Sequence, residues 1–301
     1  MSSPFAFAAH PVWLAAVLIT GTLYAVAVRR PGWHATGGQV GCFCGGLAAL
    51  AVAGAWPLGD LAAHWSLTAL VVQRLILVLC VPALLLLGTP QPLLGALTRP
   101  APVDAVVRTC SRPVVAVAVV TVAAVSTLST AAVSAQASSA AARGALTLVL
   151  VGTGFVLWLP VLGRFPGAPR LSPVGKAAYL MVQSVVPSFL AVVWIFARHP
   201  LYRSFVHRHG VAGLAPLTDQ QLAGFAAKLG TIAVLWTVAF VILTRGERAG
   251  DVGEDHEPLT WADVERHLER AERRERRRRV WLPDLGERTD GGPPPGGDPG
   301  A

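Results

Sequence analysis

Residues 66–88 read SLTALVVQRLILVLCVPALLLLG, an apolar run whose one charged side chain is Arg74. A helix of this length matches the thickness of a bilayer's hydrocarbon core, roughly 30 Å. Inside a bilayer the backbone cannot bond to water, and a helix satisfies its amides within itself. The stretch therefore predicts a membrane-spanning helix.

Six more apolar stretches of similar length are separated by clusters of arginine, proline or glycine. They cover about 11–28, 38–56, 113–133, 144–163, 177–197 and 223–244. The chain is 53% hydrophobic and only 14% charged, unlike an ordinary soluble domain. We predict an all-α membrane protein, a bundle of seven transmembrane helices. The first stretch lacks a preceding basic segment and a cleavage site, so we interpret it as a retained helix and not a signal peptide.

The basic residues predict an orientation. Arg29 and Arg30 follow the first stretch, Arg108 and Arg112 precede the fourth, and 11 of the 25 Lys and Arg residues follow residue 244. Cytoplasmic loops carry an excess of such residues, which predicts an outside N-terminus and a cytoplasmic C-terminus. The connection after 177–197, which is also basic, argues the other way. The net charge of +8 therefore indicates topology and not nucleic-acid binding.

Composition divides the chain near residue 245. We predict a membrane domain at 1–245 and a charged cytoplasmic tail at 246–301, which begins with an acidic linker at 251–258. An arginine-rich helix is expected at about 260–282, either solvated or lying on anionic lipid headgroups. The glycine- and proline-rich end, 286–301, is predicted to be disordered.

Three basic side chains fall within or at the edge of predicted spans: Arg74, Arg143 and Lys228. Charged residues in spans are costly and mark functional sites. All three lie toward the outer side, so we predict an outer basic cluster that binds an anion or a lipid headgroup. Alternatively, Arg143 and Lys228 extend to the headgroups, while Arg74 faces the interior against Asp60, Asp219 or a carbonyl group.

Two short pairs are weak candidates for metal ligands. Cys42 and Cys44 carry thiols that suit Cu(I), and His207 and His209 carry imidazoles that suit copper or zinc. However, residues two apart on a helix point about 200° away from each other. Solvated loop histidines are the simpler explanation of the second pair. The thiols are expected on the cytoplasmic side, where they stay reduced and no structural disulfide forms.

The order of several short motifs carries a family resemblance. Gln-Arg at 73–74 leads to Val-Pro at 81–82 and LGTP at 87–90; GTGFVLWLPVLG follows at 152–163, PLY at 200–202 and DQQLAG at 219–224. This order, over roughly 60–245, resembles the CtaG family of cytochrome c oxidase assembly proteins. The motif positions are Gln73, Pro82, Gly88, Pro90, Trp158, Pro160, Asp219, Gln220 and Gly224.

The resemblance also shows a departure from the family pattern. Family members place a pair of histidines four residues apart in the third span and another in the fifth. Here those positions read Leu70 and Arg74, then Arg143 and Thr147, and the usual Met-Trp after the DQQ motif reads Ala-Lys, with Lys228. A guanidinium cannot bind a metal. We therefore expect that the family's copper site is lost or replaced, and we predict no metal at these positions.

The resemblance implies a non-enzymatic factor that assists cytochrome c oxidase assembly in a bacterial-type plasma membrane. Its expected partners are oxidase subunits and membrane lipids, with no nucleic acid; a role connected with copper stays open. A transporter or channel whose three basic side chains line an anion path is the alternative. A membrane enzyme is disfavoured, because no span carries paired carboxylates, a histidine beside a nucleophile or a HExxH pattern.

Overall fold

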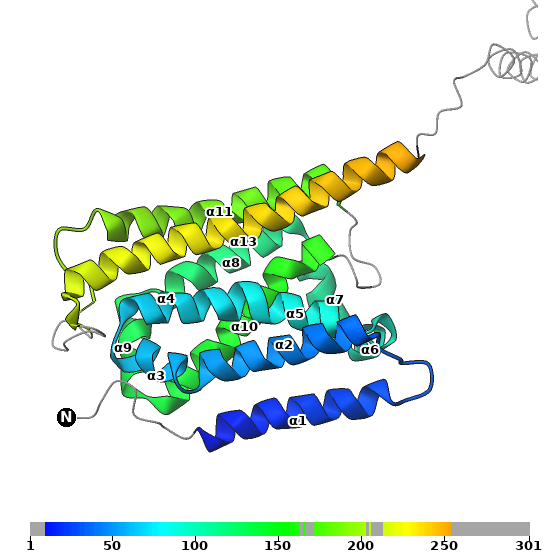
Figure 1. The fold of residues 1–301 in the computed structure, drawn as a ribbon, viewed down its shortest axis with the longest axis horizontal. Helices are drawn as coiled ribbons and strands as arrows, with labels where there is room; N and C mark the ends of the chain where they lie inside the picture. Colours follow the sequence, from blue (N-terminus) through cyan, green and yellow to red (C-terminus); the bar gives the residue numbers. More distant parts are fainter. Residues whose placement is uncertain (1–9, 163–164, 166–170, 203–204, 206–212, 254–301) are drawn as a thin grey trace, which may run out of the picture. The chain divides into compact units, whose positions relative to one another are not determined.

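The computed structural model describes residues 10–162, 165, 171–202, 205 and 213–253 (Figure 1). Over these residues every regular element is a helix, which confirms the all-α prediction. The elements are α1 (Pro11–Val28), α2 (Gly37–Gly54), α3 (Leu58–His64), α4 (Leu67–Leu75), the π-helix η1 (Ile76–Cys80), α5 (Val81–Gly88), α6 (Gln91–Leu97), α7 (Ala101–Cys110), α8 (Pro113–Thr127), α9 (Thr130–Ser138), α10 (Ala140–Leu162), α11 (Pro173–Ile195) and α13 (Pro216–Gly253).

Five helical segments among the described residues are long and apolar enough to cross a membrane. They are Gly37–His64, Leu67–Gly88, Ala140–Leu162, Pro173–Ile195 and Pro216–Gly246. A sixth is added if α7 and α8, which meet at an angle of 89°, count as one broken span. A shorter apolar helix covers Trp13–Val28. The protein is thus a multi-pass membrane protein with five or six candidate spans by length and composition.

Two predicted boundaries are wrong. The predicted span at 113–133 breaks, because the Ser129 side chain accepts a bond from the Ala132 amide and starts α9 there. The last helix begins at Pro216 instead of 223 and continues to Gly253, so the start of the predicted linker is helical. No proline interrupts residues 217–253, and the chain therefore has no obligatory stop. The arginine-rich helix and the disordered end lie outside the described residues.

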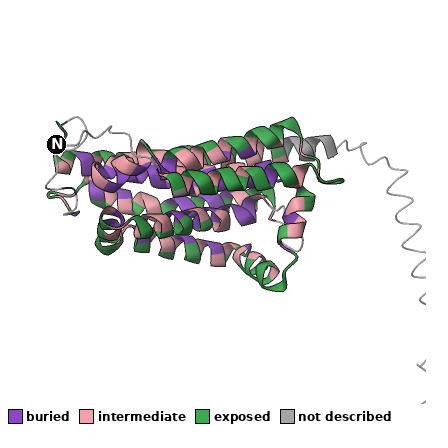
Figure 2. Cartoon of the chain, turned by 90° about the horizontal axis from the view of Figure 1, so that it is seen from below, coloured by how far each residue is buried: buried purple, intermediate pink, exposed green. Residues whose placement is uncertain are grey.

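The stretch from α4 through η1 to α5 runs through the middle of the bundle, with α2 and α10 packed against it (Figure 1). Figure 2 shows exposed residues on the outward faces of the helices and buried residues between them, as expected for a bundle that faces lipid. At the end of α5 the backbones approach closely: a Cβ on Gly88 would lie 2.5 Å from the Phe43 amide nitrogen. The Tyr24 hydroxyl donates to the Gly88 carbonyl at 2.8 Å, which ties α1 to the same point.

The π-helical turn is explained by two motifs that meet there. Pro82 has no amide hydrogen, so the carbonyl four residues earlier loses its helical partner and the helix widens. Trp158 of α10 donates its indole N–H to the Leu79 carbonyl at 2.9 Å. Gly154, one turn earlier on α10, lets that helix approach, because a Cβ there would lie 2.5 Å from Pro82 Cγ. The motifs at 81–82 and 152–163 therefore form one helix–helix joint.

The chain divides into two units, Met1–Gly246 and Glu247–Ala301. The candidate sites below all lie in the first unit.

Candidate functional site

A polar cavity of about 380 Å³ opens where α1, α3, α4, α9 and α10 come together. Its lining combines charged, polar and small side chains: His10, Pro11, Trp13, Gly54, Gly59, Asp60, Gln73, Gln136, Ala140, Arg143, Gly144 and Thr147. The cavity therefore collects side chains that lie more than 130 residues apart in the sequence.

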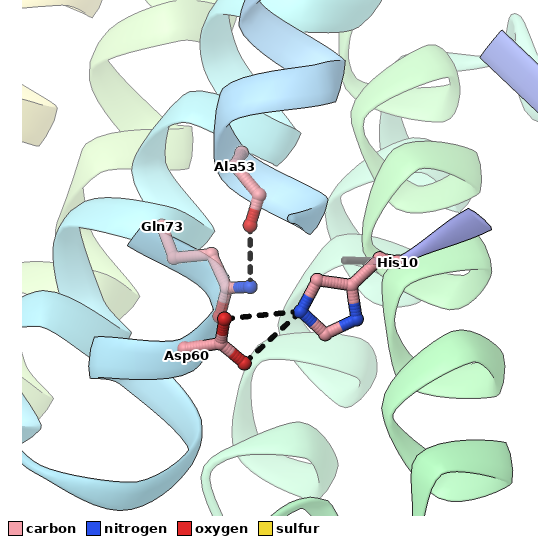
Figure 3. Close-up of polar contacts among 4 residues, drawn as sticks. All are labelled: His10, Ala53, Asp60 and Gln73. Carbon is pink, nitrogen blue, oxygen red and sulfur yellow. Dashed lines mark hydrogen bonds and ion pairs between the residues drawn. The ribbon is translucent and has the colours of Figure 1, made fainter. Parts of the chain in front are cut away.

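A histidine–carboxylate pair forms one wall of the polar cavity (Figure 3). His10 Nε2 lies 3.1 and 3.0 Å from the two carboxylate oxygens of Asp60. Beside this pair, the Gln73 amide donates to the Ala53 carbonyl at 2.7 Å, so α4 is tied to the end of α2. Asp60, which sequence reasoning offered as a partner for Arg74, instead holds the residue that precedes α1.

Gln136 of α9 is the centre of a buried network that sequence reasoning missed. Its side-chain oxygen accepts from Arg74 Nη2 at 3.2 Å, and its amide donates to Gln73 Oε1 at 3.2 Å. Its backbone carbonyl accepts from Arg143 Nη1 at 3.2 Å. Gln136 is only 4% exposed. Its bonds to Arg74 and Gln73 are buried, whereas its bond to Arg143 is partly buried. One glutamine thus joins α4, α9 and α10.

Arg74 is buried, with 6% of its surface exposed, and does not extend to the membrane surface. Its Nη1 donates to the carbonyl of Thr127, the last residue of α8, at 2.7 Å. The C-terminal end of a helix carries a partial negative charge, so a cation is favourable there. The sequence offered Asp60, Asp219 or a carbonyl group as the partner of Arg74, and in the structure that partner is the Thr127 carbonyl. Arg74 Nε has no hydrogen-bond partner.

The three basic residues predicted to cluster do not line one cavity. Arg143 lines the polar cavity, whereas Arg74 lines a second cavity between α4, α8, α10, α11 and α13, which we call the central cavity. Lys228 is half-buried on α13 and lines neither of them. Gln136 links the two arginines, each of which lines a different one of these two cavities.

Asp219, the other proposed partner for Arg74, binds the beginning of α4. Its carboxylate accepts from the Ser66 hydroxyl at 2.8 Å, from the Leu67 amide at 2.6 Å and from the Thr68 amide at 3.3 Å. Helix N-termini expose unpaired amides and a partial positive charge, so a carboxylate is favourable there. Asp219 therefore fixes the start of α13 on the start of α4.

The rest of the DQQLAG motif holds neighbouring segments in place. Gln220 Oε1 accepts from the Leu201 amide at 2.7 Å, which anchors the segment after α11. A Cβ on Gly224 would lie 2.9 Å from the Ala191 carbonyl, so only glycine permits this approach of α13 to α11. The Tyr202 hydroxyl, in the same connection, donates to the Leu128 carbonyl at 2.8 Å. Burial raises the pKa of Tyr202 while the charge of Arg74 opposes the rise, so the hydroxyl stays protonated at neutral pH.

The weak metal candidates are not brought together. Cys42 and Cys44 lie on the uninterrupted helix α2, the first half-buried and the second exposed. Residues two apart on a regular helix lie about 200° apart around its axis, so the two thiols are on different faces. His207 and His209 lie outside the described residues. Within the described ranges, no group of three or more His, Cys, Asp or Glu side chains is arranged to hold a metal ion.

The family described as cytochrome c oxidase caa3 assembly factor (Caa3_CtaG) matches residues 22–248. The chain belongs to this family. No curated protein and no solved structure matches the chain. The matched region includes the joint between η1 and α10, the contact of Asp219 with α4 and the whole Gln136 network. His10 precedes it, so the His10–Asp60 pair combines a residue of the family region with one outside it.

The residues at the family's histidine positions do not fit a copper ion. Leu70 is fully buried in an apolar cluster, and Arg74 is held by Thr127 and Gln136. Arg143 is cationic, and the Thr147 hydroxyl donates to the Arg143 carbonyl at 2.9 Å. Cu(I) prefers thiolate, thioether or imidazole ligands. None of the four side chains supplies one, and hydrogen bonds and packing occupy the positions instead.

Proposed function

We propose that this protein assists the assembly of a haem–copper oxidase through contacts with an oxidase subunit, and carries no copper at the family's histidine positions. The family match over residues 22–248 supports the first part. The absence of copper is proposed from one observation, the Gln136 network. In it, hydrogen-bonded arginines and glutamines fill the place where the imidazole ligands would be needed. On this proposal the protein has no catalytic activity of its own.

We further propose the seven-span topology, with the N-terminus outside and the C-terminus in the cytoplasm of a bacterial-type plasma membrane. Basic residues at one end of the helices support this orientation: Arg29 and Arg30 after α1, Arg108 and Arg112 around the start of α8, and Arg245 on α13 (Figure 1). The polar cavity, at the opposite end near α3 and α9, would then open to the outside. Reporter fusions placed after α1 and after α11 would test the assignment.

The alternative, an anion or lipid-headgroup transporter with a basic outer pocket, receives less support. It requires Arg74, Arg143 and Lys228 on one surface. Of the two cavities described above, Arg74 lines only the central one, Arg143 lines only the polar one and Lys228 lines neither. We therefore favour a scaffold that acts by protein contact.

Deletion of the gene tests the assembly role directly. We expect the deletion strain to lose oxidase activity and assembled oxidase, whereas other membrane enzymes keep their activity. The wild-type gene should restore both, and mild detergent should co-purify the protein with an oxidase subunit. Unchanged oxidase levels after deletion would show that the assembly role is wrong for this chain.

Cu(I) titration of the purified protein tests the second part separately. We expect well under one bound copper per chain, and full complementation by a Cys42→Ser, Cys44→Ser double variant and by His10→Ala. Stoichiometric copper that disappears in His10→Ala would show that the polar cavity is a metal site after all. If the wild-type gene complements the deletion fully and the Cys42→Ser, Cys44→Ser variant does not, copper handling would instead lie on α2.

A further inference from the structure

The outward face of α1 and α2 carries an apolar groove of about 570 Å³, which we call the α1–α2 groove. Figure 1 shows α1 at the edge of the bundle, and α2 is the helix against which it packs. The lining is mostly valine, leucine, alanine and glycine, with Thr22, Cys44 and Arg29 as its polar residues. Leu18 and Val26, which also line it, are 70% and 54% exposed. In a membrane the groove therefore opens to lipid.

Two aromatic contacts hold α1 antiparallel to α2 beside the groove. Trp13 donates its indole N–H to the Leu50 carbonyl at 3.3 Å, and the Tyr24 ring stacks on the Phe43 ring with centroids 3.7 Å apart. Alanines line the groove on both helices. Side chains this small leave the space beside the two contacts unfilled, so the chain itself does not occupy the groove.

The length of the groove matches one leaflet of a bilayer. Its lining extends along α1 from Val17 to Arg29, which is about 18 Å at the rise of an α-helix. Half of a hydrocarbon core is about 15 Å thick. The Thr22 hydroxyl in the wall donates to the Leu18 carbonyl at 2.9 Å and needs no further partner. The groove therefore suits a hydrocarbon chain that reaches from the headgroups to the middle of the membrane.

A positive charge lies at the headgroup end of the groove. Arg29 caps the C-terminal end of α1, is exposed and lines the groove. It forms no ion pair with a described residue, and no Asp or Glu precedes Asp60 in the sequence. A guanidinium stays protonated and binds phosphate through paired N–H groups. An unpaired guanidinium at the end of an apolar groove fits a phosphate that carries a hydrocarbon chain.

We propose that the α1–α2 groove binds one acyl chain of an anionic phospholipid, whose phosphate contacts Arg29. A zwitterionic lipid is disfavoured, because its ammonium group offsets the charge of the phosphate. A transmembrane helix of a partner fits less well: the cytoplasmic ends of such helices are basic and would repel Arg29, whereas the cytoplasmic leaflet is anionic. This comparison rests on the proposed orientation and not on the assembly role. The groove is separate from the predicted outer basic cluster, because Arg74, Arg143 and Lys228 do not line it.

Native mass spectrometry of the full chain in detergent tests the site. Dioleoylphosphatidylglycerol is the anionic probe, and dioleoylphosphatidylcholine is the zwitterionic control with the same acyl chains. We expect the first phosphatidylglycerol to bind saturably and about fivefold tighter than phosphatidylcholine, the value of one basic residue at an anionic surface. Equal affinities of the wild type for the two lipids would overturn the proposal.

Two pairs of variants separate the headgroup from the acyl chain. Arg29→Gln should remove the preference for phosphatidylglycerol. Arg30→Gln should keep it, because Arg30 does not line the groove and its guanidinium lies 5.3 Å from the centre of the Trp33 ring. Ala25→Leu fills the groove and should weaken binding of both lipids about tenfold, the value of roughly two buried methylenes. Ala16→Leu, which is exposed on α1 outside the groove, should bind like the wild type.

Labelling of the wild-type cysteines by N-ethylmaleimide, resolved by peptide mass spectrometry, keeps the test valid if a variant fails to fold. At a phosphatidylglycerol concentration tenfold above Kd, the reaction of Cys44, which is exposed and lines the groove, should slow about tenfold. Cys110 on α7 lies outside the groove and should keep its rate.

Equal slowing at Cys44 and Cys110 would overturn the proposal, as would the same lipid preference in Arg29→Gln and Arg30→Gln. A third outcome is that the wild type retains no lipid, while an oxidase subunit that co-purifies with it is lost in Ala25→Leu. That outcome would overturn the proposal and show that the groove is a protein interface.

Discussion

Replacement of Asp219 by alanine should destabilise the protein more than any exposed carboxylate can. The carboxylate pairs with three donors at the start of α4, of which the Ser66 hydroxyl and the Leu67 amide are buried. Leaving a buried donor unpaired costs about 1–3 kcal/mol, and the lost charge at a helix N-terminus adds about 0.3–1 kcal/mol. The expected loss in the free energy of unfolding is therefore about 2–7 kcal/mol.

The assay is thermal unfolding in detergent followed by circular dichroism at 222 nm. A mid-range loss of about 4 kcal/mol corresponds to a fall in Tm of about 8–16 °C for a chain of this size. Asp219→Asn keeps one acceptor oxygen and should lie between wild type and alanine. The matched control is Asp104→Ala on α7, which removes an exposed i,i+4 ion pair with Arg108 and should cost only about 0.2–0.5 kcal/mol.

The two aspartate variants are both expected to lower Tm, but by amounts that differ several-fold, so the comparison is decisive. If Asp219→Ala melts within 1–2 °C of Asp104→Ala, on the order of the control's own effect, the carboxylate does not hold α13 to α4. The structural explanation of the DQQ motif would then be wrong. A fall for alanine with no difference between alanine and asparagine would mean that packing, and not the hydrogen bonds, sets the effect.

Three further changes probe the other contacts. Gly154→Ala should lower Tm, because a Cβ there would meet Pro82. Gly152→Ala on the same helix is the control: its Cβ would meet nothing within 4 Å, so it should be neutral or slightly stabilising. Equal Tm values for the two variants would contradict the close approach of α10 to Pro82. Trp158→Phe removes the indole N–H that donates to the Leu79 carbonyl of η1 and should cost about 0.5–1.5 kcal/mol, the net value of one hydrogen bond. Trp236→Phe, whose ring is half exposed, should cost less, and thermal melts of both would show it. Burial raises the pKa of Tyr202 above 10, so folding favours its protonated form. Its contribution to the free energy of unfolding is complete below pH 10 and is lost as the pH rises through the folded-state pKa. The free energy of unfolding of the Tyr202→Phe protein should therefore decline less at alkaline pH than that of the wild type.

The apolar stretches, and the clusters of arginine, proline or glycine that separate them, determined much of the architecture. An 18- to 23-residue apolar run has to become a helix in lipid, because nothing else pairs its amides. The all-helical class and the central stretch at 66–88 therefore followed from the residues alone. The motifs at 81–90, 152–163 and 219–224 likewise led to the family that the match over 22–248 then showed. The break at Ser129 was missed, because a hydrophobicity pattern does not register a single capping hydroxyl.

Which polar groups meet was decided only by the tertiary structure. The sequence identified Arg74 as a costly residue and offered Asp60, Asp219 or a carbonyl group as its partner. In the structure Arg74, Asp60 and Asp219 each find a different partner: the end of α8, His10 and the start of α4, respectively. Gln136, in a stretch of serines and alanines, carried no signal at all. The physical reason is that composition and spacing show which segments prefer lipid to water. A buried polar group instead bonds to whichever donor or acceptor the packing of distant helices brings within hydrogen-bonding distance, and that depends on the whole bundle.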